Sequence, residues 1–221
     1  MEVLTILGIL LISYVVGSIP FGFLVVRFFS GKDIRKVASG RTGGTNAMRA
    51  AGFWAGLATA VLDVVKGAVV VWLAGWVAPD YVWLKVLAPV AAVIGHNYSI
   101  FIIERKEGHI RLRGGAGGAP TVGGALGLWA PSILIILPAG ALVLFGIGYA
   151  SVATMSVALL ATLIFAYRAL IGISPWQYIL YGLATEIILI IALIPNIRRL
   201  LSGNERVVGW RARHLQNKQQ S

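Results

Sequence analysis

The chain has 221 residues, of which 58% are hydrophobic and 12% charged, and its mean hydropathy is +0.84. This composition excludes an ordinary soluble globular protein and indicates an integral membrane protein. The net charge of +11 favours anionic head groups and phosphorylated metabolites as partners. Nucleic acid is not expected, because the basic residues are not interleaved with aromatic ones. The sequence contains no cysteine, which excludes disulfides and thiol catalysis.

Seven apolar segments predict an all-α fold, a polytopic membrane helical bundle. The first, residues 3–26, has 24 residues and no charge, and as a helix it would be about 36 Å long, enough to cross a membrane. The others are residues 53–77, 82–103, 119–128, 130–147, 151–170 and 176–195. The segment 119–128 is short and rich in glycine, so a five-span bundle with a broken or re-entrant piece is the alternative.

Lysine and arginine are concentrated in three stretches between these segments. Six lie in residues 27–49, four in 104–113 and six in 198–218, together 16 of the 19 in the chain. The positive-inside rule makes these stretches cytoplasmic, which puts the N-terminus outside and the C-terminus inside and requires an odd number of spans. We expect residues 1–210 to form one membrane domain and residues 211–221 a short cytoplasmic tail.

A glycine-rich loop between the first two apolar segments is the strongest candidate for an anion site. Its candidate ligands are Ser39, Gly43, Gly44, Thr45, Asn46 and Arg49. The glycines let the backbone turn its N–H groups toward one point, and the polar side chains add neutral hydrogen bonds. The arginine can form two parallel hydrogen bonds to phosphate oxygens.

Two further polar clusters are predicted on the same membrane face. The second cluster offers two arginines and a run of glycines before an apolar segment, namely Arg111, Arg113, Gly114, Gly115 and Gly117. Backbone N–H groups at the start of a helix can cradle phosphate. The third cluster, residues 196–206, follows the last apolar segment and contains Asn196 and Glu205.

A few polar residues interrupt the apolar segments. Asp63 and Lys66 are three residues apart and lie on one face of a predicted helix, where they can neutralise one another. Such a pair is either structural or part of a site. Glu186 has no obvious partner in sequence and should face the bundle interior. His96 is equally compatible with acid–base chemistry and with a hydrogen-bonded interior position.

These motifs resemble the PlsY family of bacterial membrane acyltransferases over nearly the whole chain. The matching segments are GSIPFG at residues 17–22, SGRTGGTNAMR at 39–49, DVVKG at 63–67, GHNY at 95–98 and NIRRLLSGNE at 196–205. The family motifs read roughly S-G-N-x-G-A-T-N-x-x-R, D-x-x-K-G, G-H-x-F and N-I-x-R-L followed by a glutamate.

The chain departs from the family pattern at four positions. Where the family has K-G-G-K-G-V-A-T, the second lysine, a phosphate contact, is Ala116 and the threonine is Pro120. Where the family's first motif has its leading asparagine, this chain has Arg41. Where the family has a histidine three residues before the C-terminal asparagine, this chain has Leu193. Losing a charged phosphate contact would cost about 1.5–3 kcal/mol. Arg41 and Arg111 are two candidates to replace the missing charge.

The three histidines, His96, His109 and His214, lack the spacing of metal ligands, so no metal is expected, and no other cofactor is expected either. The resemblance implies a multi-pass enzyme of the bacterial plasma membrane. It would transfer a fatty acyl group from acyl phosphate to the sn-1 hydroxyl of glycerol 3-phosphate, giving lysophosphatidic acid. The implied catalytic residues are Ser39, Arg49, His96, Asn196 and Glu205, and the glycine loops with Arg111 and Arg113 would bind phosphate. Membrane lipids and the enzyme that forms acyl phosphate are the other expected partners. Acyl-chain length and oligomeric state stay open.

Two other functions stay open as alternatives. The first is a catalytically impaired paralogue that binds phosphorylated lipid precursors, and the second is a small transporter for a phosphorylated solute. No Ser-His-Asp set is evident, so an acyl-enzyme mechanism is not expected.

Overall fold

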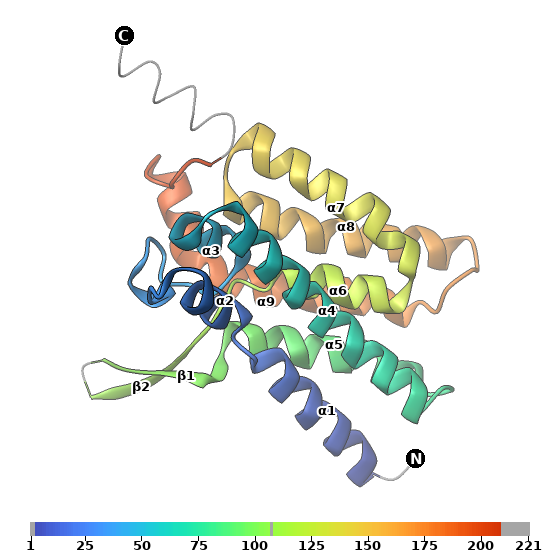
Figure 1. Ribbon diagram of the computed structural model, residues 1–221. Coiled ribbons are helices and arrows are strands. Elements are labelled where there is room, and N and C mark those ends of the chain that lie inside the picture. Colours follow the sequence, from blue (N-terminus) through green and yellow to red (C-terminus); the bar gives the residue numbers. More distant parts are fainter. Residues whose placement is uncertain (1–2, 107, 209–221) are drawn as a thin grey trace.

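The computed structural model describes residues 3–106 and 108–208, and they form a helical bundle with one β-hairpin (Figure 1). The elements, in chain order, are α1 (Val3–Ser18), α2 (Phe21–Ser30), the 3-10 turn η1 (Ile34–Lys36), α3 (Gly44–Ala51), α4 (Phe53–Val77), α5 (Val82–Asn97), β1 (Ser99–Lys106), β2 (His109–Arg113), α6 (Gly118–Leu128), the 3-10 turn η2 (Ala130–Ser132), α7 (Ile133–Leu142), the π-helical turn η3 (Val143–Ile147), α8 (Ala150–Leu170) and α9 (Gln177–Leu201). The predicted tail, residues 211–221, lies outside the described residues.

All seven predicted apolar segments contain helix, which confirms a helical membrane bundle, but they differ in length. Among the described residues, five helical stretches are long and apolar enough to cross a membrane: Val3–Ser30, Phe53–Val77, Ala130–Ile147, Ala150–Leu170 and Gln177–Leu201. α5 has 16 residues and α6 has 11, and at 1.5 Å per residue α6 is only about 17 Å long. The count of seven spans and the orientation of the bundle therefore stay predictions.

The third predicted segment, residues 82–103, is wrong as a single helix. α5 ends at Asn97, and residues 99–106 pair antiparallel with residues 109–113, with Glu104 opposite Arg111. The Ser99 hydroxyl donates to Ser18 O at 2.6 Å and accepts from the Phe101 N–H at 3.2 Å. A serine that bonds to nearby backbone in this way competes with helix continuation, and the isoleucines that follow favour a strand. The hairpin projects from one end of the bundle (Figure 1).

The first span is broken where Pro20 removes a backbone donor. α1 ends at Ser18 and α2 starts at Phe21. Lys66 Nζ donates to Ile19 O at 2.9 Å and lies 2.8 Å from Asp63 Oδ1. The buried ion pair predicted from sequence thus also supplies a hydrogen bond to a carbonyl at the break, which fixes the direction of α2.

Small residues allow the central helices to pack closely, as is common in membrane bundles. α4 packs against α6, α1 against α5, and α8 against α9. A Cβ added at Gly67 would overlap Pro120 O, and one added at Gly123 would overlap Val64 O. This close crossing holds the start of α6 against α4, at the end of the bundle where α3 also lies.

Candidate functional site

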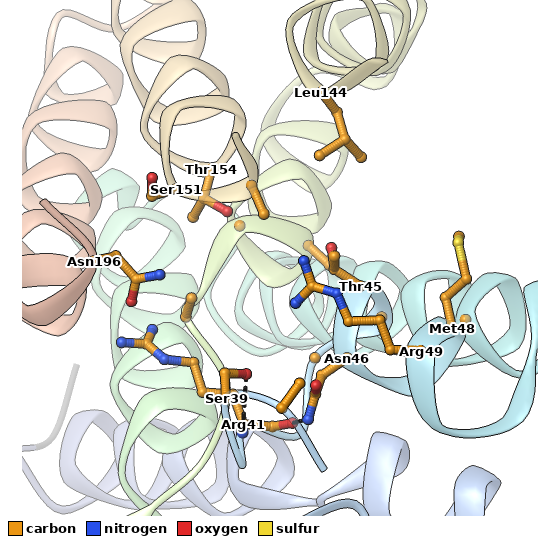
Figure 2. A pocket seen from close by; sticks show the side chains of 18 of the residues that line it. Ser39, Arg41, Thr45, Asn46, Met48, Arg49, Leu144, Ser151, Thr154 and Asn196 are labelled. Atoms are coloured by element: carbon orange, nitrogen blue, oxygen red, sulfur yellow. Dashed lines mark hydrogen bonds between the residues drawn. The ribbon is translucent and has the colours of Figure 1, made fainter. Parts of the chain in front are cut away.

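The three predicted polar clusters all contribute to one cavity of about 860 Å³. The cavity is lined by the loop before α3, by α3 itself, by the start of α6, by the α7–α8 connection and by the end of α9 with the segment after it. Its volume falls in the range of small-molecule sites, about 300–1,000 Å³. Side chains from α3, α8 and α9 surround the same space in Figure 2. Ser39 and Asn196 line this cavity as expected, whereas Gly115, which was expected to join them, does not, although its neighbour Ala116 does.

Two helix N-termini open into this cavity. α3 starts at Gly44 after Gly43, and α6 starts at Gly118 after Gly117, whose φ of +91° favours glycine. All four glycines line the cavity, together with Thr45. The first N–H groups of a helix have no acceptor within the helix, and the helix dipole makes this end positive. Each start is thus suited to bind an anion.

Arginine is the dominant charged residue in the cavity wall. The lining includes Arg41, Arg49, Arg113, Arg199 and Arg206, whereas its carboxylates, among the described residues, are Asp63 and Glu205. Burial lowers the pKa of Arg41, and the positive charges of Arg199 and Arg113 lower it further. Burial also lowers the pKa of Arg49, with Arg206 adding to the effect. Arginine still stays charged near neutral pH, so the cavity is strongly positive and favours a dianion such as a phosphate monoester.

The Ser39 loop is held in place by the end of β2. Arg113 Nη1 forms a 2.6 Å ion pair with Glu104, and its Nη2 donates to Ser39 O at 3.3 Å. The Ser39 Oγ accepts from the Arg41 N–H at 3.4 Å. Arg113 therefore lines the cavity but is partly neutralised, and much of its role is to hold residues 39–41 against the hairpin.

Asn46, predicted to bind phosphate, uses its side-chain amide inside its own loop. Nδ2 lies 2.8 Å from Arg41 O, 3.0 Å from Val37 O and 3.3 Å from Ile34 O. An amide has two hydrogens, and both are committed to these carbonyls. Asn46 thus shapes the loop that carries Ser39 and Arg41 instead of donating to a ligand.

Three members of the second predicted cluster, Arg111, Gly114 and Gly115, do not line the cavity. The Gly115 N–H donates to His96 O at 2.9 Å, and Gly114 O accepts from the Thr42 N–H at 3.2 Å, so this stretch is tied to the bundle. Arg111 is exposed and does not line the cavity. The reason is the hairpin: Arg111 lies two residues farther out than Arg113, about 7 Å along the strand.

A buried polar chain runs from the cavity into the bundle. Asp63 and His96 both line the cavity. His96 Nδ1 lies 3.5 Å from Asp63 Oδ1, and the same carboxylate pairs with Lys66. The other ring nitrogen of His96 packs against Gly115, where a Cβ would overlap it. His96 is therefore both an interior histidine and a wall of the cavity.

Glu205 is held by two neutral donors. Its Oε2 accepts from Ser151 Oγ at 2.7 Å, and its Oε1 accepts from Asn196 Nδ2 at 3.0 Å. The segment that carries Glu205 is fixed by a hydrogen bond from the Val208 N–H to Gly148 O at 2.8 Å. Ser151 and Thr154, which were not among the predicted site residues, also line the cavity from the start of α8. Small hydroxyls in the first turn of an apolar helix were the available signal.

The departures from the family pattern lie at or beside the cavity. Ala116, Leu193 and Arg41 line it, so the position of the missing lysine faces the same space as the extra arginine. Pro120 lies in the first turn of α6, where a missing N–H costs no helical hydrogen bond. This substitution is therefore compatible with the helix start.

Comparison with known proteins gives a consistent result. The family profile described as glycerol-3-phosphate acyltransferase matches residues 7–203. The chain is 34% identical to "Glycerol-3-phosphate acyltransferase 3" of Dehalococcoides mccartyi, over 96% of this chain and 100% of that protein. It is also 34% identical to a glycerol-3-phosphate acyltransferase of Chlorobium phaeobacteroides, over 91% of this chain and 96% of the relative.

A solved structure shares the fold. The crystal structure of PlsY (YgiH), an integral membrane glycerol 3-phosphate acyltransferase in its glycerol 3-phosphate form, superposes with a TM-score of 0.77 at 27% identity, covering 93% of this chain and 96% of that one. The five long apolar helices and this integral membrane neighbour make the chain a multi-pass membrane protein. With the profile spanning most of its length, the chain belongs to the glycerol-3-phosphate acyltransferase family.

Proposed function

We propose that this protein transfers a fatty acyl group from acyl phosphate to the sn-1 hydroxyl of glycerol 3-phosphate, giving lysophosphatidic acid in a bacterial plasma membrane. The observation that carries the proposal is the pairing of two glycine-capped helix N-termini with five arginines in one cavity. Both reactants carry a phosphate group, and such a cavity can bind two of them. The relatives named glycerol-3-phosphate acyltransferase support glycerol 3-phosphate as the acyl acceptor.

An apolar side of the cavity suits the acyl chain. Its lining includes Met48 and Leu57 from α3 and α4, and Leu144 and Phe145 from the turn after α7. In Figure 2, Leu144 lies above the Arg49 side chain and Met48 to its right. A fatty chain bound between these walls would place its carboxyl end beside the arginines. Burial of its methylene groups would contribute roughly 0.8 kcal/mol each.

The proposed chemistry is a direct attack with no acyl-enzyme. The sn-1 oxygen of glycerol 3-phosphate attacks the carbonyl carbon of acyl phosphate and forms the ester bond. The bond between that carbon and the phosphate oxygen breaks, and the leaving phosphate accepts the hydroxyl proton. Because acyl phosphate is already activated, the protein contributes mainly by orienting the reactants and by stabilising negative charge.

We assign the roles by position in the cavity. Ser39 and Arg49, with the N–H groups at the start of α3, would hold one phosphate, and the start of α6 would hold the other. Glu205, fixed by Asn196, would orient the glycerol hydroxyls. His96, which lines the cavity, would help to hold the reacting groups in position. The enzyme that forms acyl phosphate is a proposed partner, since it would supply the donor.

The test is an assay of detergent-purified protein with palmitoyl phosphate and labelled glycerol 3-phosphate, without acyl carrier protein or coenzyme A. We expect labelled lysophosphatidic acid, and we expect Arg49→Ala to abolish its formation while the variant keeps the wild-type elution profile. A wild-type protein that binds glycerol 3-phosphate without turnover would instead identify an impaired paralogue. Counterflow of glycerol 3-phosphate in proteoliposomes would identify a transporter.

A further inference from the structure

Arg41 is a half-buried cation of the cavity wall whose side chain has one buried, unused donor atom. One guanidinium nitrogen, Nη2, donates to Ala192 O near the end of α9. The other, Nη1, is buried and has no hydrogen-bond partner among the described residues. Buried polar groups are nearly always hydrogen-bonded, and a charged donor without a partner is especially unfavourable. An acceptor from a bound ligand would satisfy it.

The charges around Arg41 favour an anionic ligand. None of the described carboxylates forms an ion pair with Arg41. Glu104 pairs with Arg113, and Asp63 pairs with Lys66. Glu205 is the other carboxylate of the wall, and its oxygens accept from neutral donors. Glu205 attracts Arg41 without forming an ion pair with it, so the positive charge of Arg41 is only partly compensated by the protein. A phosphate group bound beside it would supply both the negative charge and the missing acceptor.

The guanidinium is also held in place before any ligand binds. The Arg41 N–H bonds to Ser39 Oγ, and Arg41 O accepts from Asn46 Nδ2, so the backbone is fixed on both sides. The bond from Nη2 to Ala192 O anchors the far end of the side chain. A donor fixed in this way loses little freedom on binding, which favours affinity.

From these observations we propose that Arg41 is a phosphate ligand of the acyltransferase site and supplies the cationic contact that Ala116 lacks. The proposal rests on the function proposed above and goes beyond it by naming a substrate-binding residue particular to this chain. Ala116 and Arg41 line the same cavity, and the side chain of alanine leaves room there. Arg111, the other candidate, is exposed and lies outside the cavity.

The experiment uses four proteins and their initial rates with palmitoyl phosphate and glycerol 3-phosphate, each varied in turn. Arg41→Asn should lower kcat/KM by roughly 10- to 100-fold, the amount expected for one charged hydrogen bond. The reactant whose KM rises identifies which phosphate Arg41 binds. Adding Ala116→Lys to Arg41→Asn should recover tenfold or more. Arg105→Asn, on the exposed face of the hairpin, is the matched control and should keep the wild-type value.

Several outcomes would overturn the proposal. Wild-type kcat/KM in Arg41→Asn would remove Arg41 from the site, and a loss that Ala116→Lys does not reverse would reduce its role to holding the loop. Should Arg41→Asn not purify as a folded protein, Arg41→Lys replaces it. That variant keeps the charge but lacks the second donor nitrogen, so an unchanged KM for both reactants would refute the proposal.

Failure of the proposed function is distinguishable from failure of this inference. Thermal stabilisation by glycerol 3-phosphate and by inorganic phosphate is measured for the wild type and for Arg41→Asn. An inactive wild type whose stabilisation depends on Arg41 would refute acyl transfer and support the phosphate ligand. An active wild type that the two ligands stabilise no more than they stabilise Arg41→Asn would support acyl transfer and refute Arg41 as a phosphate ligand.

Discussion

The ion pair between Asp63 and Lys66 should be essential for the stability of the bundle, and Lys66→Met tests this. The substitution preserves much of the side-chain volume but removes the charge that lies 2.8 Å from Asp63 Oδ1 and the donor that lies 2.9 Å from Ile19 O. The side chains of Asp63 and Lys66 are almost fully buried, at 1% and 2% exposure. Removing one partner of a buried pair costs about 3–5 kcal/mol, because the other charge stays buried and unpaired.

The expected loss is large enough to measure by thermal unfolding in detergent. For a chain of this size about 1 kcal/mol corresponds to about 2–4 °C, so Lys66→Met should lower the melting temperature by roughly 6–20 °C. The double variant Asp63→Asn with Lys66→Met should recover part of this loss, because no unpaired carboxylate stays buried. A Lys66→Met protein that melts within 2 °C of the wild type would refute the reasoning.

Three further perturbations address the site and its surroundings. Glu205→Gln should lower the acyl-transfer rate at least tenfold, since the amide group cannot accept from both Ser151 and Asn196; an unchanged rate would show that the carboxylate is dispensable. Gly117→Ala should lower both melting temperature and activity, because φ is +91° and the added Cβ would crowd Leu189 Cδ1 at 2.7 Å; wild-type values for both would contradict this. Arg35 lowers the pKa of Asp33 to about 2, below the unfolded value of about 3.9, so Asp33 stabilises the fold above about pH 4 and loses this effect as the pH falls through 2. The stability difference between wild type and Asp33→Asn, less than about 1 kcal/mol for an exposed pair, should shrink between pH 5 and pH 2, and a difference independent of pH would disprove the linkage.

Much of the membrane architecture was predictable because hydropathy and basic charge are local properties of the chain. A run of apolar side chains must leave water wherever it occurs, so each predicted segment contains helix. The three polar clusters could likewise be assigned to one end of the bundle from the arginines and lysines that flank the segments. The cavity lined by Ser39, Gly117 and Asn196 agrees with that assignment.

The partners of individual polar groups could not be predicted, because they depend on contacts between residues distant in sequence. Asn46 and Gly115 were expected to donate to phosphate. Instead, Asn46 Nδ2 donates to Arg41 O and to two other carbonyls of its own loop, and the Gly115 N–H donates to His96 O. The strand at residues 99–106 depends on Ser99 meeting Ser18, which is 81 residues away. A sequence shows that a donor exists, but not which acceptor it will face.

By itself, therefore, the sequence determined that this is a helical membrane protein with a basic, glycine-rich end that resembles a phosphate-using acyltransferase. Tertiary structure alone decided which basic residues share the cavity. Arg41 and Arg111 are indistinguishable as charges in the sequence, but folding places Arg41 in the cavity wall beside Ala192 and leaves Arg111 exposed on β2. The physical reason is that hydrophobic burial follows composition, whereas the surroundings of a charge follow the packing of helices far apart in the chain.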